Sequence, residues 1–268
     1  MSGPNRDHPS PGGRRPPPPF RPVEVVCTDR LSSRLARITL TGPALEGLIV
    51  EQPAASVRVL LPSASERDLV MPAWTGNAFE RPDGRRPVIR TLTPRHLDPE
   101  NLLLDVDVVL HNGGAASEWA QAAGPGDPAA VSGPARGYSV DPNAPSFLLA
   151  GDETAIPAIS QLLERLPASK PVRVEIEVAD PDARMTLPDR SGAAVNWLDL
   201  PAGAAPGSAL VAAVGDAELG PETRVWVAGE AAAVQRIRRL LLEERGLPRT
   251  RATVRGYWKH GRTGSAED

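Results

Sequence analysis

The stretch Arg90-Thr91-Leu92-Thr93-Pro94-Arg95 closes one β-like run of the chain, and a Gly-rich turn, His111-Asn112-Gly113-Gly114-Ala115-Ala116-Ser117-Glu118-Trp119, follows the next. The first stretch places guanidinium groups and hydroxyls on a strand, which suits a diphosphate and the polar edges of a ring system. The second runs into a short helix, whose free N–H groups and positive dipole end favour an anion. Because a barrel would set the strand and the helix start side by side, the pair predicts a flavin dinucleotide site.

Each part of this pair also has a purely structural interpretation. Ser117 can cap a helix over residues 119–123, so Gly113 and Gly114 can be ordinary turn residues. His111 is the titratable group nearest to the turn. A neutral imidazole there can hydrogen-bond a flavin or a substrate, or be satisfied by backbone at the end of a strand.

Around these stretches, the first half of the chain has the pattern of a small antiparallel barrel. Its β-rich runs, punctuated by turn residues, are 23–28, 35–41, 56–61, 87–93, 102–110 and 129–132. Six such runs predict a six-stranded antiparallel barrel domain over residues 22–140. In the fifth run Val106 and Val108 fall on one face, and Asp105 and Asp107 on the other, which we interpret as solvated.

The second half changes to a strand–helix–strand pattern. Strands are predicted at 146–150, 172–178, 224–227 and 253–258, and helices at 154–166 and 231–245. This order is typical of a parallel sheet with crossover helices, and it predicts an α/β domain over residues 141–262. The expected fold class is therefore a β barrel followed by an α/β domain.

Two acidic loops follow strands of this predicted sheet. Gly151-Asp152-Glu153-Thr154 lies where the first parallel strand passes into a helix, and Gly229-Glu230 repeats the arrangement after a later strand. Open α/β sheets bind ligands in the crevice at this edge, although no G-x-G-x-x-G motif marks a dinucleotide site here. The carboxylates can equally serve to cap helix dipoles.

The C-terminal segment 256–262 places the aromatic residues Tyr257 and Trp258 beside Lys259, His260 and Arg262. Such a cluster can bind an anionic or aromatic ligand. The alternative is a last strand that simply ends in exposed charges.

Composition limits the possible functions. A net charge of −3 gives no reason to expect nucleic acid or an anionic membrane surface as a partner. Cys27 is the only cysteine, so an internal disulfide, a thiolate zinc site and a cysteine-ligated iron–sulfur cluster are excluded, and the four histidines have no metal-ligand spacing. Redox chemistry would need a bound cofactor, and we predict no metal site.

The ends of the chain differ from its middle. Residues 1–21 are rich in Pro and Arg and predict a disordered arm, or else a proline-rich ligand for a partner domain, and 263–268 form a tail. No apolar run is long enough to span a bilayer, and no apolar signal core follows Arg14 and Arg15. We therefore expect a cytoplasmic protein without membrane insertion.

In this order, these motifs resemble the siderophore-interacting protein family, FAD-dependent ferric-siderophore reductases built like ferredoxin-NADP reductase. The resemblance covers about residues 22–262. It rests on Arg-Thr-Leu-Thr-Pro-Arg, on Leu-His followed by Gly-Ala-Ala-Ser-Glu-Trp-Ala, on Ala-Gly-Asp-Glu-Thr-Ala-Ile-Pro-Ala, on Val-Ala-Gly-Glu and on Gly-Tyr-Trp-Lys-His-Gly.

The resemblance implies where FAD binds. Arg90, Thr91 and Thr93 would contact it, and His111 would lie by the flavin, which makes His111 and Thr93 the candidate catalytic residues. The diphosphate would be cradled by Gly114, Ala115, Ala116 and Ser117. The usual family pattern is Arg-x-Tyr-Thr, with the tyrosine stacked on the isoalloxazine; in this chain that position is Leu92.

The resemblance also implies a second cofactor and a substrate. The nicotinamide side would be formed by Asp152, Glu153 and Thr154, with the loop Gly229-Glu230 beside them. Lys259 would lie near the siderophore pocket, with Trp258 and Arg262 as its neighbours.

The implied activity is a reductase that takes a hydride from NADPH or NADH, or electrons from a ferredoxin, onto FAD. It would pass them singly to Fe(III) in a ferric siderophore, and the ferrous iron, which binds hard oxygen chelators less well, would be released in the cytoplasm. Two alternatives stay open: a flavoprotein that passes electrons to a protein partner, and a siderophore-binding protein that has lost its flavin, as Leu92 would allow. We expect a monomer.

Overall fold

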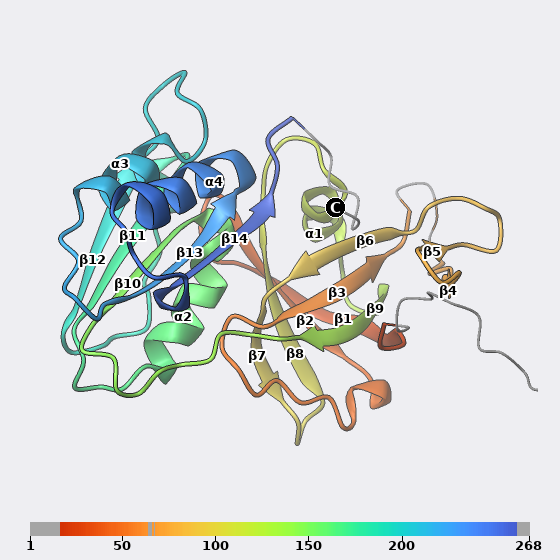
Figure 1. Cartoon of the computed structure of the whole chain (residues 1–268). Helices are drawn as coiled ribbons and strands as arrows, with labels where there is room; N and C mark the ends of the chain where they lie inside the picture. The colour runs from red at the N-terminus through yellow and green to blue at the C-terminus, as the bar shows by residue number, and fades with distance from the viewer. Residues whose placement is uncertain (1–16, 64–65, 67, 262–268) are drawn as a thin grey trace, which may run out of the picture.

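A twisted antiparallel sheet and a parallel sheet lie side by side in the molecule (Figure 1). The computed structural model describes residues 17–63, 66 and 68–261. The antiparallel sheet has seven strands in the order β6-β3-β9-β1-β2-β8-β7. These strands are β1 (Arg21–Arg30), β2 (Leu35–Thr41), β3 (Ser56–Leu61), β6 (Val88–Leu92), β7 (Pro94–Asp98), β8 (Leu103–Val109) and β9 (Pro128–Ala135).

The number of strands corrects the prediction of six. The run predicted at 87–93 ends at Leu92, and residues 94–98 form a separate strand, β7, which pairs with β8. β6 and β7 lie at the two ends of the strand order, and among the described residues no ladder joins them. The sheet is therefore barrel-like in its curvature, with two edge strands. The chain segment that connects β3 to β6 contains a short hairpin of β4 (Ala73–Trp74) and β5 (Phe79–Glu80) (Figure 1).

The inner face of this sheet is an apolar core, because the strands alternate as predicted. Leu104, Val106 and Val108 of β8 are buried in one cluster with the other strands. The outer face is less solvated than expected: Asp107 is buried and accepts two hydrogen bonds from Arg37 of β2, at 2.7 and 3.0 Å. The interpretation of Asp107 as a solvated residue is therefore wrong, because Arg37 stands directly opposite it in the register.

The parallel sheet confirms the α/β prediction and adds elements to it. Its five strands have the order β12-β11-β10-β13-β14, namely β10 (Phe147–Asp152), β11 (Val172–Val178), β12 (Ala193–Asp199), β13 (Arg224–Glu230) and β14 (Ala252–Trp258). The helices are α1 (Ala115–Ala122), α2 (Ile156–Arg165), α3 (Ser208–Asp216) and α4 (Ala231–Arg239), which continues in a π-helical turn over Leu240–Glu244. Short 3-10 turns are η1 (Pro43–Leu45), η2 (Glu153–Ala155), η3 (Pro181–Ala183) and η5 (Arg249–Arg251).

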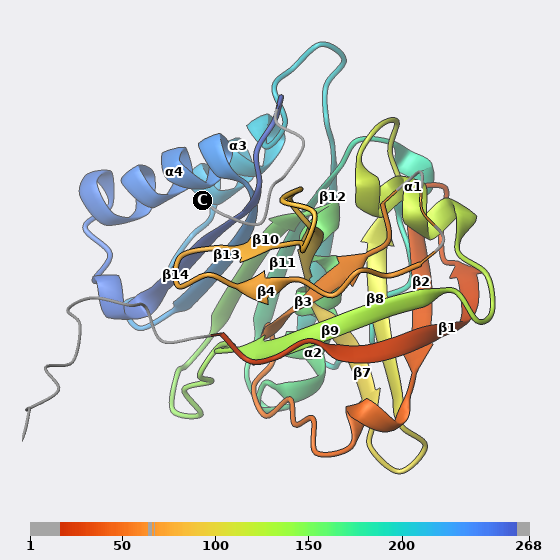
Figure 2. The same ribbon diagram turned by 90° about the vertical axis from the view of Figure 1, so that its right-hand side faces the viewer.

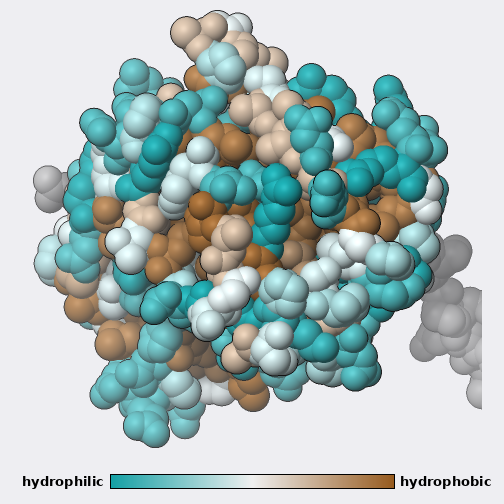
Figure 3. All heavy atoms as spheres, turned by 90° about the vertical axis from the view of Figure 1, so that its left-hand side faces the viewer, coloured by the Kyte–Doolittle hydropathy of each residue, from teal (hydrophilic) through white to brown (hydrophobic). Residues whose placement is uncertain are grey.

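Helices cover both faces of the parallel sheet. Leu149 of β10 packs in one cluster with α2, whereas Leu148 and Ala150 pack in another with α3 and α4. Figure 2 shows α3 and α4 together on one side of the sheet. β12 is an edge strand with Val195 exposed, and on this side of the molecule apolar and hydrophilic residues are interspersed (Figure 3).

The two units share a core. Leu35, Ala54 and Tyr138 come from the first half of the chain, yet they are buried in the same cluster as α2 and the parallel sheet. Gln161 of α2 reinforces this junction, since its side chain accepts from the Ala54 N–H at 2.9 Å and donates to the Pro94 carbonyl at 2.5 Å. The site described below therefore lies between two units that are packed against each other.

The described residues test only part of the predicted N-terminal arm and none of the predicted C-terminal tail. The Pro18 carbonyl accepts from the Ser132 hydroxyl at 2.5 Å, the Phe20 ring meets the Phe79 ring edge-on, and Arg21 already belongs to β1. The predicted arm is therefore too long at its C-terminal end. Its residues 1–16 and the predicted tail 263–268 lie outside the described residues. No helix in the described ranges has the length and apolarity needed to cross a membrane.

Candidate functional site

The Gly-rich turn leads directly into α1, as its sequence predicts. Gly113 has a φ of +76° and Gly114 a φ of +121°, which residues with a side chain rarely adopt. A Cβ on Gly114 would lie 2.7 Å from Cε1 of the His111 ring, so the turn passes close against the imidazole. The first helical hydrogen bond runs from the Glu118 N–H to the Gly114 carbonyl. The N–H groups of residues 115–117 therefore have no partner within the helix and point from its N-terminus.

Ser117 does not cap the helix, which was the structural alternative for this residue. The helix begins at Ala115 with Gly114 as its N-cap, so Ser117 is not a cap but lies within the first turn. Its buried hydroxyl accepts from the His111 N–H at 2.9 Å and donates to the His111 carbonyl at 2.8 Å. The prediction that Ser117 caps the helix is wrong, because its hydroxyl instead binds both backbone groups of His111 and so closes the turn. Any anion contact at Ser117 would have to use its backbone N–H.

Arg90 is a half-buried guanidinium on β6. It stands opposite Val59 of the barrel core, and Leu92, two residues later, stands opposite Val57, so the two side chains share a face. The guanidinium donates to the Ile89 carbonyl at 2.8 Å, and no carboxylate among the described residues pairs with it. Burial lowers the pKa of Arg90 from its usual value, because the charge is desolvated without compensation. An anion at this position would supply that compensation.

The strand of Arg90 and the start of α1 rest on the same core. Leu92 of β6 and Ala116 of α1 both pack against the buried barrel cluster, and Figure 1 shows α1 above β6. Thr91 is exposed on the opposite face of the strand, whereas Thr93 is buried, with 6% of its surface exposed. Burial raises the pKa of the Tyr257 phenol on β14, and the nearby side chain of Thr93 acts in the opposite direction.

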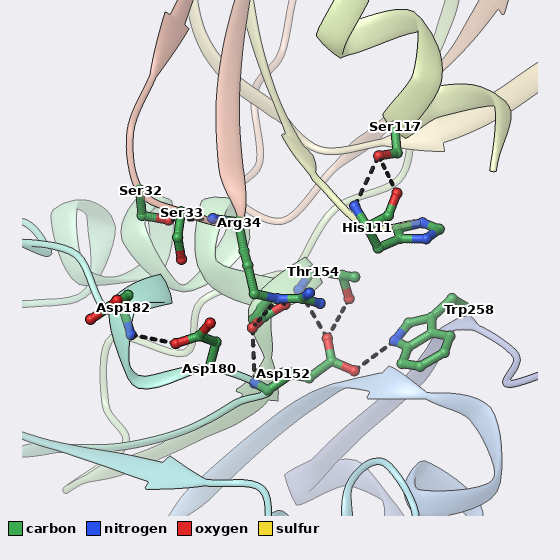
Figure 4. Close-up of polar contacts among 12 residues, drawn as sticks. Ser32, Ser33, Arg34, His111, Ser117, Asp152, Thr154, Asp180, Asp182 and Trp258 are labelled. Carbon is green, nitrogen blue, oxygen red and sulfur yellow. Dashed lines mark hydrogen bonds and ion pairs between the residues drawn. The ribbon is translucent and has the colours of Figure 1, made fainter. Parts of the chain in front are cut away.

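Asp152 lies at the carboxyl end of β10, across the domain junction from His111 and Ser117 (Figure 4). One carboxylate oxygen accepts from the N–H and hydroxyl of Thr154, at 2.9 and 2.5 Å. The other accepts from the Glu230 N–H at 2.8 Å and from the Trp258 indole Nε1 at 2.7 Å. Burial raises the pKa of Asp152, and these four donors act in the opposite direction.

The other two acidic side chains of this edge are also engaged. Both carboxylate oxygens of Glu153 accept from the Arg34 Nε at 2.8 Å. One of them also accepts from the Ala179 N–H at 2.9 Å. Glu230 caps α4 by accepting from the Ala233 N–H at 2.9 Å, which agrees with the alternative interpretation of this residue. That Asp152, Glu153, Thr154, Gly229 and Glu230 line a nicotinamide cofactor stays a prediction.

The C-terminal cluster lies beside these carboxylates. Trp258 is 37% exposed, and Lys259 is exposed next to it. The His260 ring meets the Trp258 ring at 72°, with centroids 6.3 Å apart. Arg262, the third predicted substrate residue, lies outside the described residues.

Arg34 was not a predicted site residue, and Tyr257 was predicted only as a member of the C-terminal aromatic and basic cluster. Arg34 belongs to a turn between the first two strands, and its partner Glu153 is 119 residues away. Tyr257 stood within a recognised motif, but only the docking of the two units brings it to Thr93. Local spacing contains no signal for either contact.

Comparisons with known proteins cover almost the whole chain. Residues 24–138 match the model of the siderophore-interacting FAD-binding domain, and residues 144–261 match that of the siderophore-interacting protein. A siderophore utilization protein from T. fusca has a similar structure, with a TM-score of 0.82 and 35% identity over 94% of this chain and 97% of that one. The Amycolatopsis cytochrome P450 reductase GcoB, 16% identical, shares the fold, with a TM-score of 0.64 over 91% of this chain and 72% of that one.

Curated relatives point the same way. The NADPH-dependent ferric-chelate reductase of Escherichia coli is 31% identical over 245 residues, which cover 89% of this chain and 92% of that protein. Ferric vibriobactin reductase ViuB of Vibrio cholerae is 29% identical over 249 residues, or 92% of each chain. With domain matches that run from residue 24 to residue 261, and relatives similar over nearly their full length, this chain belongs to the siderophore-interacting protein family.

Proposed function

We propose that this flavin-dependent oxidoreductase reduces the Fe(III) of a ferric siderophore. The observation that carries the proposal is Arg90, a half-buried guanidinium that no carboxylate among the described residues neutralises. The strand that carries Arg90 packs through Leu92 on the same apolar core as the start of α1. The N–H groups of residues 115–117 at that helix start have no partner within the helix. A desolvated cation and a helix N-terminus together fit the diphosphate of FAD.

Each residue of the barrel side has a role in this proposal. Arg90 neutralises the diphosphate, and the backbone at Gly114, Ala115, Ala116 and Ser117 donates hydrogen bonds to it. When bound, FAD accepts a hydride and gives up electrons one at a time.

The ring system would be held by the end of β6 and the strand after it. Leu92 would cover one ring face by apolar contact, and Thr93 would bind a polar edge. Thr91, whose side chain faces the other side of the strand, would contact FAD through its backbone. His111, exposed beside the turn, would hydrogen-bond the flavin or the substrate.

The α/β side would bring the electron donor and the iron chelate. The ferric-chelate reductase of E. coli uses NADPH by its name, which supports NADPH as donor here; NADH and a ferredoxin are the other candidates. Lys259 and Trp258, together with Arg262, would bind an anionic ferric siderophore by charge and aromatic contact. The location of this reaction in the cytoplasm and the monomeric state stay predictions.

Anaerobic reduction of a ferric chelate by the FAD-loaded protein tests the proposal. Ferrous iron is trapped with a chromogenic chelator, with NADPH, NADH or reduced ferredoxin as donor, and apoprotein as control. We expect iron reduction that depends on FAD. A protein that binds no FAD is the siderophore-binding alternative, and one that reduces a protein acceptor but no ferric chelate is the flavoprotein alternative. Either result would refute the proposal.

A further inference from the structure

The ends of β11 and β12 carry three exposed carboxylates. Val178, the last residue of β11, stands opposite Asp199, the last residue of β12, so the chain leaves the sheet at neighbouring points after both strands. Asp180 and Asp182 follow β11, and Asp180 accepts from the Asp182 N–H at 2.9 Å (Figure 4). The side chains of Asp180, Asp182 and Asp199 are exposed. An anion that binds at this edge of the sheet therefore meets three negative charges.

The positive charges of the same part of the chain are already engaged. Between β11 and α3 the chain contains two cationic side chains, Arg184 and Arg190. Arg184 donates to the Asp199 carboxylate at 2.5 Å. Arg190 donates to backbone carbonyls of the chain that precedes β11, at the opposite edge of the sheet. A phosphate would have to take Arg184 from Asp199, and the three carboxylates would remain.

The barrel turn beside this edge supplies no free cation either. Its Ser33 N–H donates to the Asp182 carbonyl at 3.4 Å, so the turn lies against the segment that follows β11. Arg30 donates to two carbonyls of its own turn, including that of Ser33. Arg34 is paired with the carboxylate of Glu153. Both guanidinium groups of this turn are therefore bound within the protein.

The start of α3, which follows β12, is also closed to an anion. The buried carboxylate of Glu177 on β11 accepts from the Gly207 N–H at 2.6 Å and from the Leu210 N–H at 3.0 Å. A helix N-terminus binds phosphate through N–H groups of this kind. In this chain a carboxylate of the protein itself occupies that position.

A hollow beside the ion pair of Arg184 and Asp199 offers room for an apolar ring. Its volume is about 520 Å³, and it is lined by Leu31, Arg184, Met185 and Thr186. Leu31 and Met185 are partly buried and pack against the core that contains α2. Apolar side chains of this kind cover a flat ring, and a thioether adapts to its shape. The hollow therefore suits a purine base next to a charged pair.

We propose that this edge binds the adenosine end of the electron donor, and that Asp199 makes NADH the donor in preference to NADPH. The 2′-hydroxyl of NADH can donate a hydrogen bond to a carboxylate. NADPH carries a phosphate at the same position, and like charges brought together in an interface are costly. This inference rests on the proposed function, whose donor it specifies. It separates this chain from the E. coli relative, which is NADPH-dependent by its name.

Binding of two redox-inert probes to the oxidised, FAD-loaded protein tests the proposal. ADP-ribose carries the adenosine diphosphate of NADH, and 2′-phospho-ADP-ribose differs from it by the 2′-phosphate alone. Isothermal titration calorimetry gives each Kd without any turnover, and absorbance gives the FAD occupancy of every sample. We expect the wild type to bind ADP-ribose about tenfold more tightly than the phosphorylated probe.

Two substitutions in the ion pair separate its charges. Asp199→Asn removes one carboxylate and releases Arg184, so it is expected to tighten binding of 2′-phospho-ADP-ribose about tenfold. It should weaken binding of ADP-ribose, because an amide oxygen accepts a hydrogen bond less strongly than a carboxylate. Arg184→Gln should weaken the phosphorylated probe further. In the double variant Asp199→Asn/Arg184→Gln, the gain for this probe should be smaller than in Asp199→Asn, since no guanidinium is left to bind the phosphate.

The hollow is tested with the same probes. Met185→Gln should weaken both of them equally, by about threefold to tenfold, because the adenine ring is common to both. Asp141→Asn is the matched control for Asp199→Asn. It also removes a carboxylate that pairs with an arginine, Arg224 at 2.5 Å, but Arg224 begins β13 and so lies at the opposite edge of the sheet. This control should leave both Kd values unchanged.

Three results would overturn the inference: equal or tighter binding of the phosphorylated probe by the wild type, an unchanged ratio of the two Kd values in Asp199→Asn, and a wild type that binds neither probe. The proposed function fails separately. Iron reduction with reduced ferredoxin does not use the nucleotide edge, so it would uphold the proposed function even if neither probe binds. Selective binding of ADP-ribose without iron reduction by any donor would refute the proposed function alone.

Discussion

Replacing Arg90 by methionine tests the proposed diphosphate site most directly. Methionine keeps an unbranched apolar stem against the barrel core and removes only the charged fork. The desolvated guanidinium has no carboxylate partner among the described residues, so its hydrogen bonds to a bound diphosphate would be charge-assisted. Such bonds contribute about 1.5–3 kcal/mol, and the Kd for FAD should rise about tenfold to 150-fold.

The same substitution should weaken FAD binding without lowering the stability of the apoprotein. Burial lowers the pKa of Arg90, which means that the folded state holds this charge less favourably than water does. Arg90→Met should therefore leave the Tm of the apoprotein unchanged or raise it, while it lowers the Tm gained on adding FAD. A simple packing defect would instead lower both values.

Arg58→Met is the matched control. Arg58 lies on the neighbouring strand β3 opposite Thr91, so it faces away from Arg90, and it stands 6.0 Å from the centre of the Phe79 ring. Titrating each apoprotein with FAD, followed by flavin fluorescence, gives the Kd values. An unchanged Kd in folded Arg90→Met, or an equal loss in Arg58→Met, would refute the assignment of Arg90 to the diphosphate.

Three further variants probe the turn, the ring face and a surface ion cluster. Gly114→Ala should weaken FAD binding in the same titration, because the methyl group collides with the His111 ring and the backbone φ is +121°; unchanged affinity would show that the turn can shift freely. Leu92→Tyr should tighten FAD binding by up to about tenfold through aromatic stacking, and weaker binding would mean that the ring face is already filled. Glu66 is held by Arg81 and Arg85, which lower its pKa to about 2, so its contribution to stability is present above its usual pKa of 4.5 and is lost as the pH falls through about 2. The Tm difference between wild type and Glu66→Gln should therefore be seen at pH 7 and vanish near pH 2, and a difference independent of pH would contradict this reasoning.

The sequence predicted those parts of the fold that local periodicity encodes. β8 alternates apolar and polar residues, and it was predicted within one residue at either end. β7 was missed because it is a five-residue strand that begins at Pro94 and is followed by Pro99, and it pairs with only one neighbour, β8. β12 was missed because it is an edge strand without a buried alternation, and its pattern of exposed residues gives no strand signal.

The site was predictable only in part, and for a related reason. The Gly-rich turn and Arg90 can be recognised from short motifs, since their chemistry lies within a few neighbouring residues. The donors to Asp152 include groups 78 and 106 residues away, and those contacts exist only once β10, β13 and β14 lie in one sheet. Local spacing therefore identified Asp152 as a functional candidate but could not reveal that its carboxylate is already occupied.

The shared core at the junction limits how this chain can be divided or recombined. Leu35, Ala54 and Tyr138 belong to the barrel by sequence, yet they are buried among residues of α2 and the parallel sheet. A cut near residue 140 would leave these side chains, and the apolar face of α2, open to water on two separate fragments. The barrel and the α/β unit are thus not interchangeable modules, and a chimera of two relatives would need to take the residues on both sides of this shared core from the same protein.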